Sequence, residues 1–220
     1  MINIAIDGPA GAGKSTIAKR VAKELNYIYV DTGAMYRAIA YYLLENKVDV
    51  EDEQALSKAL KNVSVSIQYE EGTQQVYLNG DNVTKYLRTE AVGNMASVSS
   101  AKTVVRAALL ELQRTLAQEN DVVMDGRDIG TNVLPGAQVK VYLTASSAER
   151  ASRRYKELVE KGETADLAQI EKDIIERDNR DMSREIAPLK QAEDAVYIDS
   201  SDMSIDEVVE AIQGLLGSVK

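Results

Sequence analysis

"IAIDGPAGAGKST", residues 4–16, places the spacing Gly8-x-x-x-x-Gly13-Lys14-Ser15 between an apolar strand pattern and a helical pattern. A strand, this spacing and a helix in that order predict a phosphate-binding loop. The glycines let consecutive backbone amides face a phosphate, and the amino end of the helix adds positive charge. We expect Lys14 to reach the β and γ phosphates and the Ser15 hydroxyl to bind Mg²⁺. The alternative is a glycine-rich turn that merely looks like such a loop. The residues of the predicted triphosphate site are Gly8, Pro9, Ala10, Gly11, Ala12, Gly13, Lys14, Ser15 and Thr16.

The composition excludes several kinds of chemistry. The 220 residues, 45% of them hydrophobic, are enough for one domain with a buried core. The chain has no His, Cys, Trp or Phe. Thiol and imidazole nucleophiles, Ser-His triads and zinc sites built from Cys and His are therefore ruled out. Any reaction must use carboxylates, Lys, Arg, hydroxyls, backbone amides and a metal bound through oxygen.

The charge and the apolar pattern restrict the partners. The formal net charge is -9 and the sequence pI is about 4.8, which disfavours duplex nucleic acid as a ligand. Small anions can still bind if basic groups gather in a cleft. The amino-terminal residues lack the pattern of a signal peptide, and no apolar run reaches the 18 or so residues of a membrane helix. We expect a cytosolic protein without a membrane partner, and the absence of cysteine agrees with a reducing compartment.

Strand and helix patterns alternate along the chain. Short apolar runs predict strands at 2–6, 27–30, 122–124, 139–143 and 195–198. Helical patterns occupy 15–25, 34–45, 102–119, 147–159, 166–184 and 205–216. The alternation predicts an α/β fold of the P-loop NTPase type, with a five-stranded parallel sheet flanked by helices. Ser204 and Glu207 form a capping box at the start of the last helix, and Gly217 can end it.

Residues 63–87 depart from this pattern. Apolar and polar residues alternate over 63–69, a second strand follows at 74–78, and turns are predicted at 71–72 and 79–80. This segment is expected to be a small antiparallel insert that lies apart from the parallel sheet. Because no linker or low-complexity tract borders it, we interpret the insert as a lobe of the same domain.

Charged residues follow two of the predicted strands. Asp125, Arg127 and Asp128 come directly after the predicted strand 122–124. Ligands of parallel sheets bind beyond the carboxyl ends of the strands, so these side chains are expected to face the ligand. Asp125 is expected to point toward Mg²⁺ or its water, and the alternative is a turn-forming Asp before Gly126. After 27–30 come Asp31, Thr32 and Arg37. There the alternative is a helix cap made by Asp31 or Thr32, with Arg37 solvated.

Two helical segments carry clustered arginines. Arg150, Arg153 and Arg154 lie in one, and "ERDNRDMSR", residues 176–184, holds the trio Arg177, Arg180 and Arg184. At about 100° per residue the trio can share one face. The alternatives are solvated helix faces and, for Arg177 with Asp181, an exposed ion pair of about 0–1 kcal/mol.

Taken together, these arginines indicate a second phosphorylated ligand, because one triphosphate already has the loop, Lys14 and Mg²⁺. Guanidinium groups bind and orient phosphate oxygens, which is the main requirement of phosphoryl transfer. The absence of His agrees with a phosphate monoester as acceptor. The second pKa of such an ester is about 6, so the group is largely ionised at neutral pH and no general base is needed.

With the P-loop, "DTGAMYR", the antiparallel insert, "DGRDIGT" and "ERDNRDMSREIAPL" in this order, the chain resembles the bacterial cytidylate (CMP) kinases of the nucleoside monophosphate kinase group. The resemblance runs from Ile4 to the final helix. It implies transfer of the ATP γ-phosphate to CMP or dCMP, giving CDP or dCDP, with Mg²⁺ as the metal. It also implies a core of residues 1–36, 99–150 and 185–220, a monophosphate-binding lobe at about 37–98 and a short helical lid at about 151–170.

The resemblance assigns individual roles. The catalytic set implied is Lys14, Arg37, Asp125, Arg127 and Arg184, and Arg154 looks like part of the lid over ATP. Arg37 and Arg127 look like clamps on the CMP phosphate, and Thr32 keeps the hydroxyl where some relatives carry Ser. The residues that resemble the base and ribose site are Ser97, Arg106, Asp128, Arg177, Asp181 and Arg184.

The residues alone leave two matters open. Spacing and charge would make "MASVSSAKTVVR", residues 95–106, a helix start capped by Ser99 or Ser100 with Arg106 exposed. The P-loop by itself also occurs in kinases that phosphorylate a hydroxyl, such as shikimate-type enzymes, and in nucleotide-dependent switches or binding modules. A monomer that binds ATP and CMP or dCMP, and no nucleic acid, is the expectation.

Overall fold

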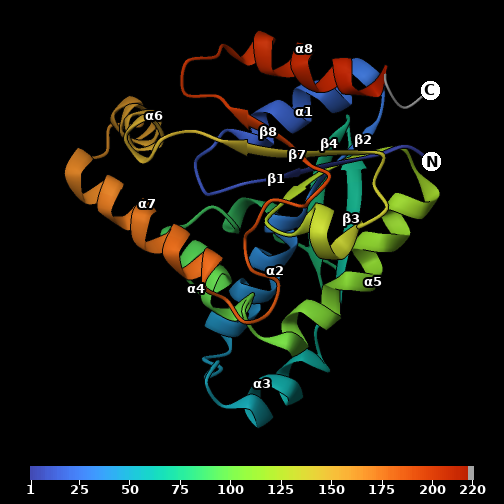
Figure 1. Ribbon diagram of the computed structural model, residues 1–220. Helices are drawn as coiled ribbons and strands as arrows, with labels where there is room; N and C mark the ends of the chain where they lie inside the picture. The colour runs from blue at the N-terminus through green and yellow to red at the C-terminus, as the bar shows by residue number, and fades with distance from the viewer. Residues whose placement is uncertain (218–220) are drawn as a thin grey trace.

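The computed structural model describes residues 1–217, which contain two β-sheets (Figure 1). The strands of the larger sheet are β1 (Asn3–Asp7), β2 (Ile28–Asp31), β6 (Val122–Gly126), β7 (Val139–Thr144) and β8 (Val196–Asp199). All their pairings are parallel, and the order across the sheet is β2-β6-β1-β7-β8. The predicted five-stranded parallel sheet is therefore confirmed, with strand ends within two residues of those expected. No helix in the described part of the chain is long and apolar enough to cross a membrane.

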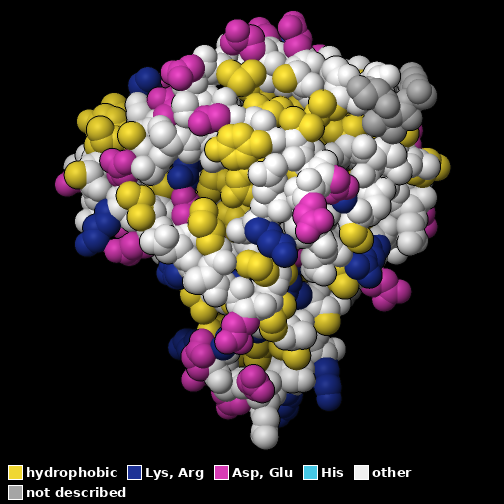
Figure 2. Space-filling model, in the orientation of Figure 1, with side chains coloured by type: hydrophobic (Ala, Val, Ile, Leu, Met, Phe, Trp, Pro, Cys, Tyr) yellow, Lys and Arg dark blue, Asp and Glu magenta, His cyan; other side chains and the backbone are white. Residues whose placement is uncertain are grey.

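Helices cover both faces of this sheet (Figure 1). On one face lie α1 (Lys14–Leu25) and α8 (Ile205–Leu216), and on the other α2 (Thr32–Glu45) and α5 (Thr103–Glu119). The last helix begins with the predicted capping box of Ser204 and Glu207 and ends at Gly217. On the face drawn in Figure 2, acidic side chains gather over α8 and around the opposite tip of the molecule.

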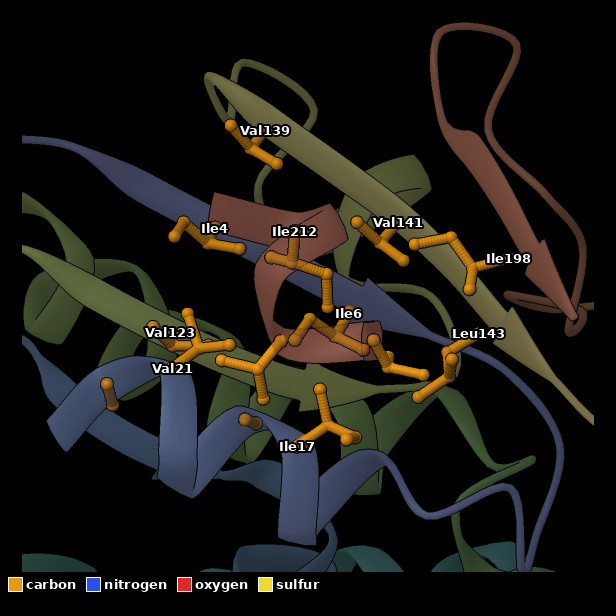
Figure 3. Packing of buried hydrophobic residues seen from close by; sticks show 14 of the residues in the cluster. Ile4, Ile6, Ile17, Val21, Val123, Val139, Val141, Leu143, Ile198 and Ile212 are labelled. Atoms are coloured by element: carbon orange, nitrogen blue, oxygen red, sulfur yellow. The ribbon is translucent and has the colours of Figure 1, made fainter. Parts of the chain in front are cut away.

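The core beneath α1 and α8 explains why these helices form (Figure 3). Ile17 and Val21 project from α1, four residues apart, and pack against the sheet with Ile212 of α8. Ile4 and Ile6 of β1 are fully buried on the same face. Each such side chain contributes about 1.5–3 kcal/mol through burial. Because β1 is the central strand, this packing fixes where the loop after it begins.

The insert forms a separate antiparallel sheet of β3 (Val65–Glu70), β4 (Thr73–Leu78) and β5 (Asp81–Asn82), followed by the 3-10 turn η1 (Thr84–Tyr86). Both connecting turns have positive φ at their two central positions, as the Glu71-Gly72 and Asn79-Gly80 dipeptides predicted. Val76 and Leu78 of β4 pack against α2. The insert is thus attached to the helix that begins beside the predicted site.

Four α-helices of the described chain remain, and three of them supply residues to the cleft described below. The four are α3 (Glu53–Leu60), α4 (Glu90–Ser99), α6 (Ser147–Glu160) and α7 (Leu167–Met182). The helices α6 and α7 pack on each other, α4 packs on α2, and α7 ends two residues before the predicted position 184. Sequence analysis missed α3 and α4. The helix α3 buries only Leu56 fully, which leaves a weak apolar pattern.

Candidate active site

A cleft of about 510 Å³ opens at the carboxyl ends of β1, β2 and β6. Ligands of parallel α/β sheets bind at this edge, because the loops that follow the strands meet there. The cleft takes residues from the P-loop, α2, α4, α5, α6, α7 and the segment after β6. Of the predicted site residues, it is lined by Ala10, Gly11, Gly13, Lys14, Ser15, Thr16, Thr32, Arg37, Ser97, Arg106, Asp125, Arg127, Asp128, Arg154, Arg177, Asp181 and Arg184.

Gly8, Pro9 and Ala12 do not line the cleft and instead shape the loop. A Cβ atom on Gly8 would lie 1.9 Å from the carbonyl oxygen of Leu143, so only glycine fits against β7 there. Gly11 and Gly13 have φ of 76° and 81°, a conformation that glycine adopts without strain. The loop therefore depends on glycine both for its backbone angles and for its fit to the sheet.

Lys14 is 6% exposed and its Nζ donates a hydrogen bond to the Pro9 carbonyl oxygen at 2.7 Å. Burial, and then the positive charge of Arg127, lower the pKa of Lys14 to about 7. Because a bound polyphosphate would favour the charged ammonium, ligand binding is expected to raise this pKa again. The buried lysine is thus held at the floor of the cleft by its own loop.

Ser15 and Asp125 form a pair of oxygen donors beside the loop. The Ser15 hydroxyl donates to Asp125 Oδ2 at 2.8 Å, and the Tyr29 hydroxyl donates to Oδ1 at 3.1 Å. Burial, and then the charge of Asp31, raise the pKa of Asp125 to about 6. A hydroxyl and a carboxylate suit Mg²⁺, which prefers oxygen ligands and commonly binds one or two carboxylates together with substrate phosphates. The donor set therefore fits the expected metal.

Asp31 and Thr32 begin α2 in different ways. Asp31 is the N-cap and accepts a hydrogen bond from the Ala34 amide at 2.8 Å, so the cap alternative is correct for Asp31. It is wrong for Thr32, whose hydroxyl donates to the Asp125 carbonyl oxygen at 2.7 Å. Arg37 is not simply solvated, because its Nη2 lies 3.1 Å from Asp31 Oδ2 and its buried Nε has no partner. Arg37 is thus held at the rim of the cleft.

Asp181 is a buried carboxylate of the cleft that pairs with two arginines. Its Oδ2 accepts from Arg127 Nε at 2.9 Å, and its Oδ1 accepts from Arg184 Nη2. Burial tends to raise the pKa of Asp181, but Arg127 and Arg184 outweigh it and keep this pKa below the usual value of 3.8. The alternative of an exposed Arg177–Asp181 pair is wrong, because Asp181 is 1% exposed and its ion-pair partners are these other two arginines.

The arginine trio of "ERDNRDMSR" separates in the structure. Arg177 lines the cleft, and burial followed by the charge of Arg127 lowers its pKa to about 10. Arg184 lies beyond the end of α7, and its side chain is 8% exposed. Arg180 is exposed and does not line the cleft. The expectation that all three share one face is therefore wrong for Arg180.

Ser97, Arg106 and Asp128 form the other end of the cleft. Arg106 is 7% exposed, pairs with Asp128, and donates to the Ser100 carbonyl oxygen at 3.2 Å. The Ser97 hydroxyl is buried and has no hydrogen-bond partner. The interpretation of 95–106 as a capped helix start with Arg106 exposed is wrong, because α4 ends at Ser99 and α5 follows Lys102, which makes no side-chain cap.

The three arginines of α6 have different surroundings. Arg154 is the outermost, with 47% of its side chain exposed and Nη1 2.9 Å from Glu157. Arg153 donates to Glu149 and to the Ser200 carbonyl oxygen. Arg150 is 5% exposed, donates to the Ala10 carbonyl oxygen at 2.9 Å and lies 2.7 Å from Asp178 of α7. Arg150 thus joins the P-loop to the helix that carries Arg177 and Asp181.

Sequence reasoning missed one aromatic residue that lines the cleft and two buried aspartates that lie beside it without lining it. They are Asp7, Asp178 and Tyr36, whose ring centre lies 5.5 Å from Arg106 Cζ. Asp7 directly precedes the P-loop and Asp178 adjoins Arg177, so their positions next to predicted site residues were a usable signal. No pattern in the sequence links Tyr36 to Arg106, because the two residues lie 70 positions apart on different helices.

The fold and the cleft define the class of protein, a P-loop α/β kinase in which a phosphate loop and a cluster of arginines line the same cleft. Residues 4–217 match the model of the cytidylate kinase family, and the chain belongs to that family. The cytidylate kinase of Bacillus thuringiensis strain Al Hakam is 50% identical over 218 residues, which cover 99% of this chain and 97% of that protein. The cytidylate kinase of Bacillus anthracis strain CDC 684 is 50% identical over 215 residues, 98% of this chain and 96% of that protein.

Among solved structures, a protein from Eubacterium ventriosum has a TM-score of 0.52 at 13% identity and covers 99% of both chains. That similarity concerns the fold alone. The resemblance expected from the ordered motifs is confirmed by the family match, and the chain is an ATP-dependent nucleoside monophosphate kinase. The rival interpretations, a hydroxyl-phosphorylating kinase and a nucleotide-dependent switch, are not supported by this family.

Proposed function

We propose that this protein transfers the γ-phosphate of ATP to CMP or dCMP and releases ADP with CDP or dCDP. One observation carries the proposal beyond family membership. In a chain of net charge -9, Arg37, Arg127, Arg177 and Arg184 line the same cleft as the P-loop. Such a concentration of guanidinium groups in an acidic protein supports a second phosphorylated ligand facing the first.

At the donor end, the P-loop amides and Lys14 bind the triphosphate of ATP. Ser15 and Asp125 hold Mg²⁺, which neutralises charge on the phosphate oxygens when it is bound. The buried Lys14 ammonium lies where negative charge increases during transfer. Thr16 and the remaining cleft-lining amides of residues 10–16 complete the contacts. The donor end thus orients the γ-phosphate and stabilises its charge.

At the acceptor end, Arg37, Arg127 and Arg184 orient the phosphate of CMP. One of its oxygens bonds to the γ-phosphorus, and the bond from that phosphorus to the β-γ bridging oxygen breaks, so ADP leaves. Because the acceptor oxygen is already ionised at neutral pH, no side chain has to remove a proton. The chemistry therefore requires positioning and charge stabilisation, which is what the described residues offer.

The nucleoside is bound by the rest of the cleft. Arg177 and Asp181 contact the ribose, and Ser97, Arg106 and Asp128 contact the cytosine edge. The unpartnered buried hydroxyl of Ser97 supports this assignment, since a buried polar group without a partner is unfavourable unless a ligand satisfies it. The segment 151–170 acts as a lid that excludes water, with Arg154 over ATP and the lobe 37–98 on the acceptor side.

The test is ADP release from Mg-ATP with CMP, dCMP, UMP, AMP, GMP and shikimate as acceptors. We expect stimulation mainly by CMP and dCMP, with CDP or dCDP identified as the product. Tight ATP binding without stimulation by any monophosphate would contradict the proposal. Light scattering on the same sample tests the expected monomer.

A further inference from the structure

A buried carboxylate that the proposed reaction does not use lies at the carboxyl end of β1, outside the lining of the cleft. Asp7 is the last residue of β1, directly before Gly8, and it is 5% exposed. Its Oδ1 accepts the Ile129 amide hydrogen at 2.8 Å, and its Oδ2 accepts the Gly130 amide hydrogen at 2.7 Å. A carboxylate is unfavourable in the interior unless its oxygens are satisfied, so these two hydrogen bonds define its role.

The two amides belong to the π-helical turn η2 (Ile129–Val133), and Asp128 is the residue before it. Aspartate at this N-cap position ordinarily accepts amide hydrogens from its own helix. Asp128 makes no such hydrogen bond. Its carboxylate instead accepts from Arg106 and, at 3.0 Å, from Asn132 Nδ2. Asp7 therefore occupies the capping role that Asp128 leaves open.

We propose that Asp7 is a positioning residue for the acceptor base: by capping η2 in place of Asp128, it keeps the Asp128 carboxylate directed at the base end of the cleft. The inference rests on the proposed function, in which Asp128 contacts cytosine. A carboxylate accepts from the amino group of cytosine but not from the oxygen that uracil carries at the same place. Asp7 thus contributes to the preference for CMP over UMP without touching either nucleotide.

The surroundings of Asp7 leave little room for it to move. It pairs with Gly126 of β6 and with Tyr142 of β7 in the central part of the sheet. A Cβ atom on Gly130 would lie 3.4 Å from Asp7 Oδ2 and 3.2 Å from Lys140 Cδ, so the turn fits closely over the carboxylate. Since Gly8 follows Asp7 directly, the same residue joins the P-loop to the segment that carries Arg127 and Asp128.

The test is the variant Asp7→Asn. The amide oxygen can accept one backbone hydrogen, but the amide nitrogen then faces the other N–H, so one of the two hydrogen bonds is lost. We expect kcat/KM for CMP to fall about tenfold, as for the loss of one hydrogen bond to a charged group. We expect kcat/KM for UMP to fall less, so the ratio of kcat/KM for CMP to kcat/KM for UMP decreases. KM for ATP should stay within about twofold of the wild-type value.

The matched control is Asp121→Asn. Asp121 Oδ1 accepts the Ile2 amide hydrogen at 2.6 Å, so it joins β1 to the segment before β6 at the end of the sheet away from the cleft. This variant should leave the CMP-to-UMP ratio unchanged even if it lowers stability. If Asp7→Asn does not fold, Asp7→Ser, whose hydroxyl can accept one amide hydrogen, takes its place in the same measurement.

An equal loss for CMP and UMP, or no loss for either, would overturn the inference and leave Asp7 a structural residue. A lower ratio in Asp7→Asn with an unchanged ratio in Asp121→Asn supports it. These outcomes differ from failure of the proposed function itself. In that case the wild-type protein would release no ADP in response to CMP.

Discussion

The two ends of the cleft are built in different ways. The donor end is one continuous segment, residues 8–16, whose shape is set by backbone angles and by glycines that fit against β7. The acceptor end is assembled from side chains on α2, α4, α5 and α7 and from the segments after β6 and α7, and its most distant members, Arg37 and Arg184, are 147 positions apart in the chain. The donor end depends on local geometry, whereas the acceptor end depends on the tertiary fold.

Charge pairing is the second difference. Lys14 is held by a carbonyl oxygen of its own loop, whereas Arg37, Arg106 and Arg127 each pair with an aspartate. A buried or half-buried guanidinium is stabilised by a counter-charge when no ligand is present. The aspartates of the acceptor end therefore hold the arginines in place before the substrate arrives, and variants of the two ends should fail for different reasons.

The largest effect is expected for Lys14→Ala. Removal of the only lysine in the loop withdraws the charge next to the transferred phosphate, and we expect turnover to fall by about 10³-fold or more. Because Lys14 is held by one hydrogen bond to its own loop, the fold should persist by circular dichroism. Lys23→Ala, on the exposed side of the same helix, is the control. Near-normal turnover in Lys14→Ala would contradict the proposal that the loop binds the phosphates of ATP for transfer.

The next effect is expected for Arg127→Ala. We expect kcat/KM for CMP to fall about 10²–10³-fold, since a donor that orients charge in the reaction is lost. Asp181, which is buried, also loses one of its two arginine partners, so the free energy of unfolding should decrease. Arg180→Ala is the control, because Arg180 is exposed and lies outside the cleft. Equal losses in the two variants would contradict the division between cleft and surface arginines.

Asp181→Asn should have a smaller and pH-dependent effect. The folded protein holds the pKa of Asp181 below 3.8, so its charge stabilises the fold at pH above 3.8, and this contribution is lost as pH falls through the lower folded-state pKa. In urea unfolding at pH 7, we expect the free energy of unfolding of the variant to be about 2 kcal/mol lower than that of the wild type. The deficit should shrink below pH 3.8. Asp173→Asn, exposed on the same helix, should show none. A deficit that does not change with pH would contradict the charge pairing.

The smallest effect is expected for Ser204→Ala, which touches neither end of the cleft. It removes the hydroxyl that accepts the Glu207 amide hydrogen at 3.2 Å in the capping box of α8. We expect a loss of about 1 kcal/mol in the free energy of unfolding, or roughly 2–4 °C in Tm. Turnover with CMP below the Tm should not change. A parallel loss of activity would mean that stability alone accounts for part of the effects of the cleft variants.

Much of this architecture was predictable, because its causes are local in sequence. The five strands, the six long helices, the antiparallel insert and the P-loop follow from apolar periodicity, turn dipeptides and glycine spacing. Short α3 and α4 were missed, since α3 fully buries only Leu56, and the buried positions of α4 include Ser97 and Ser99 beside Val92 and Ala96, which is not an apolar pattern. The roles of the site residues stay predictions until the kinetic tests are made.

By itself the sequence determined the phosphate loop, because backbone angles and adjacent side chains specify it within nine residues. It also determined the class of chemistry, since His and Cys are absent and arginines are clustered. Only the tertiary structure decided which arginines enter the cleft, that Arg106 is buried against Asp128, and that Asp7 caps η2. Burial and ion pairing depend on how distant elements pack, and spacing along one chain does not contain that information.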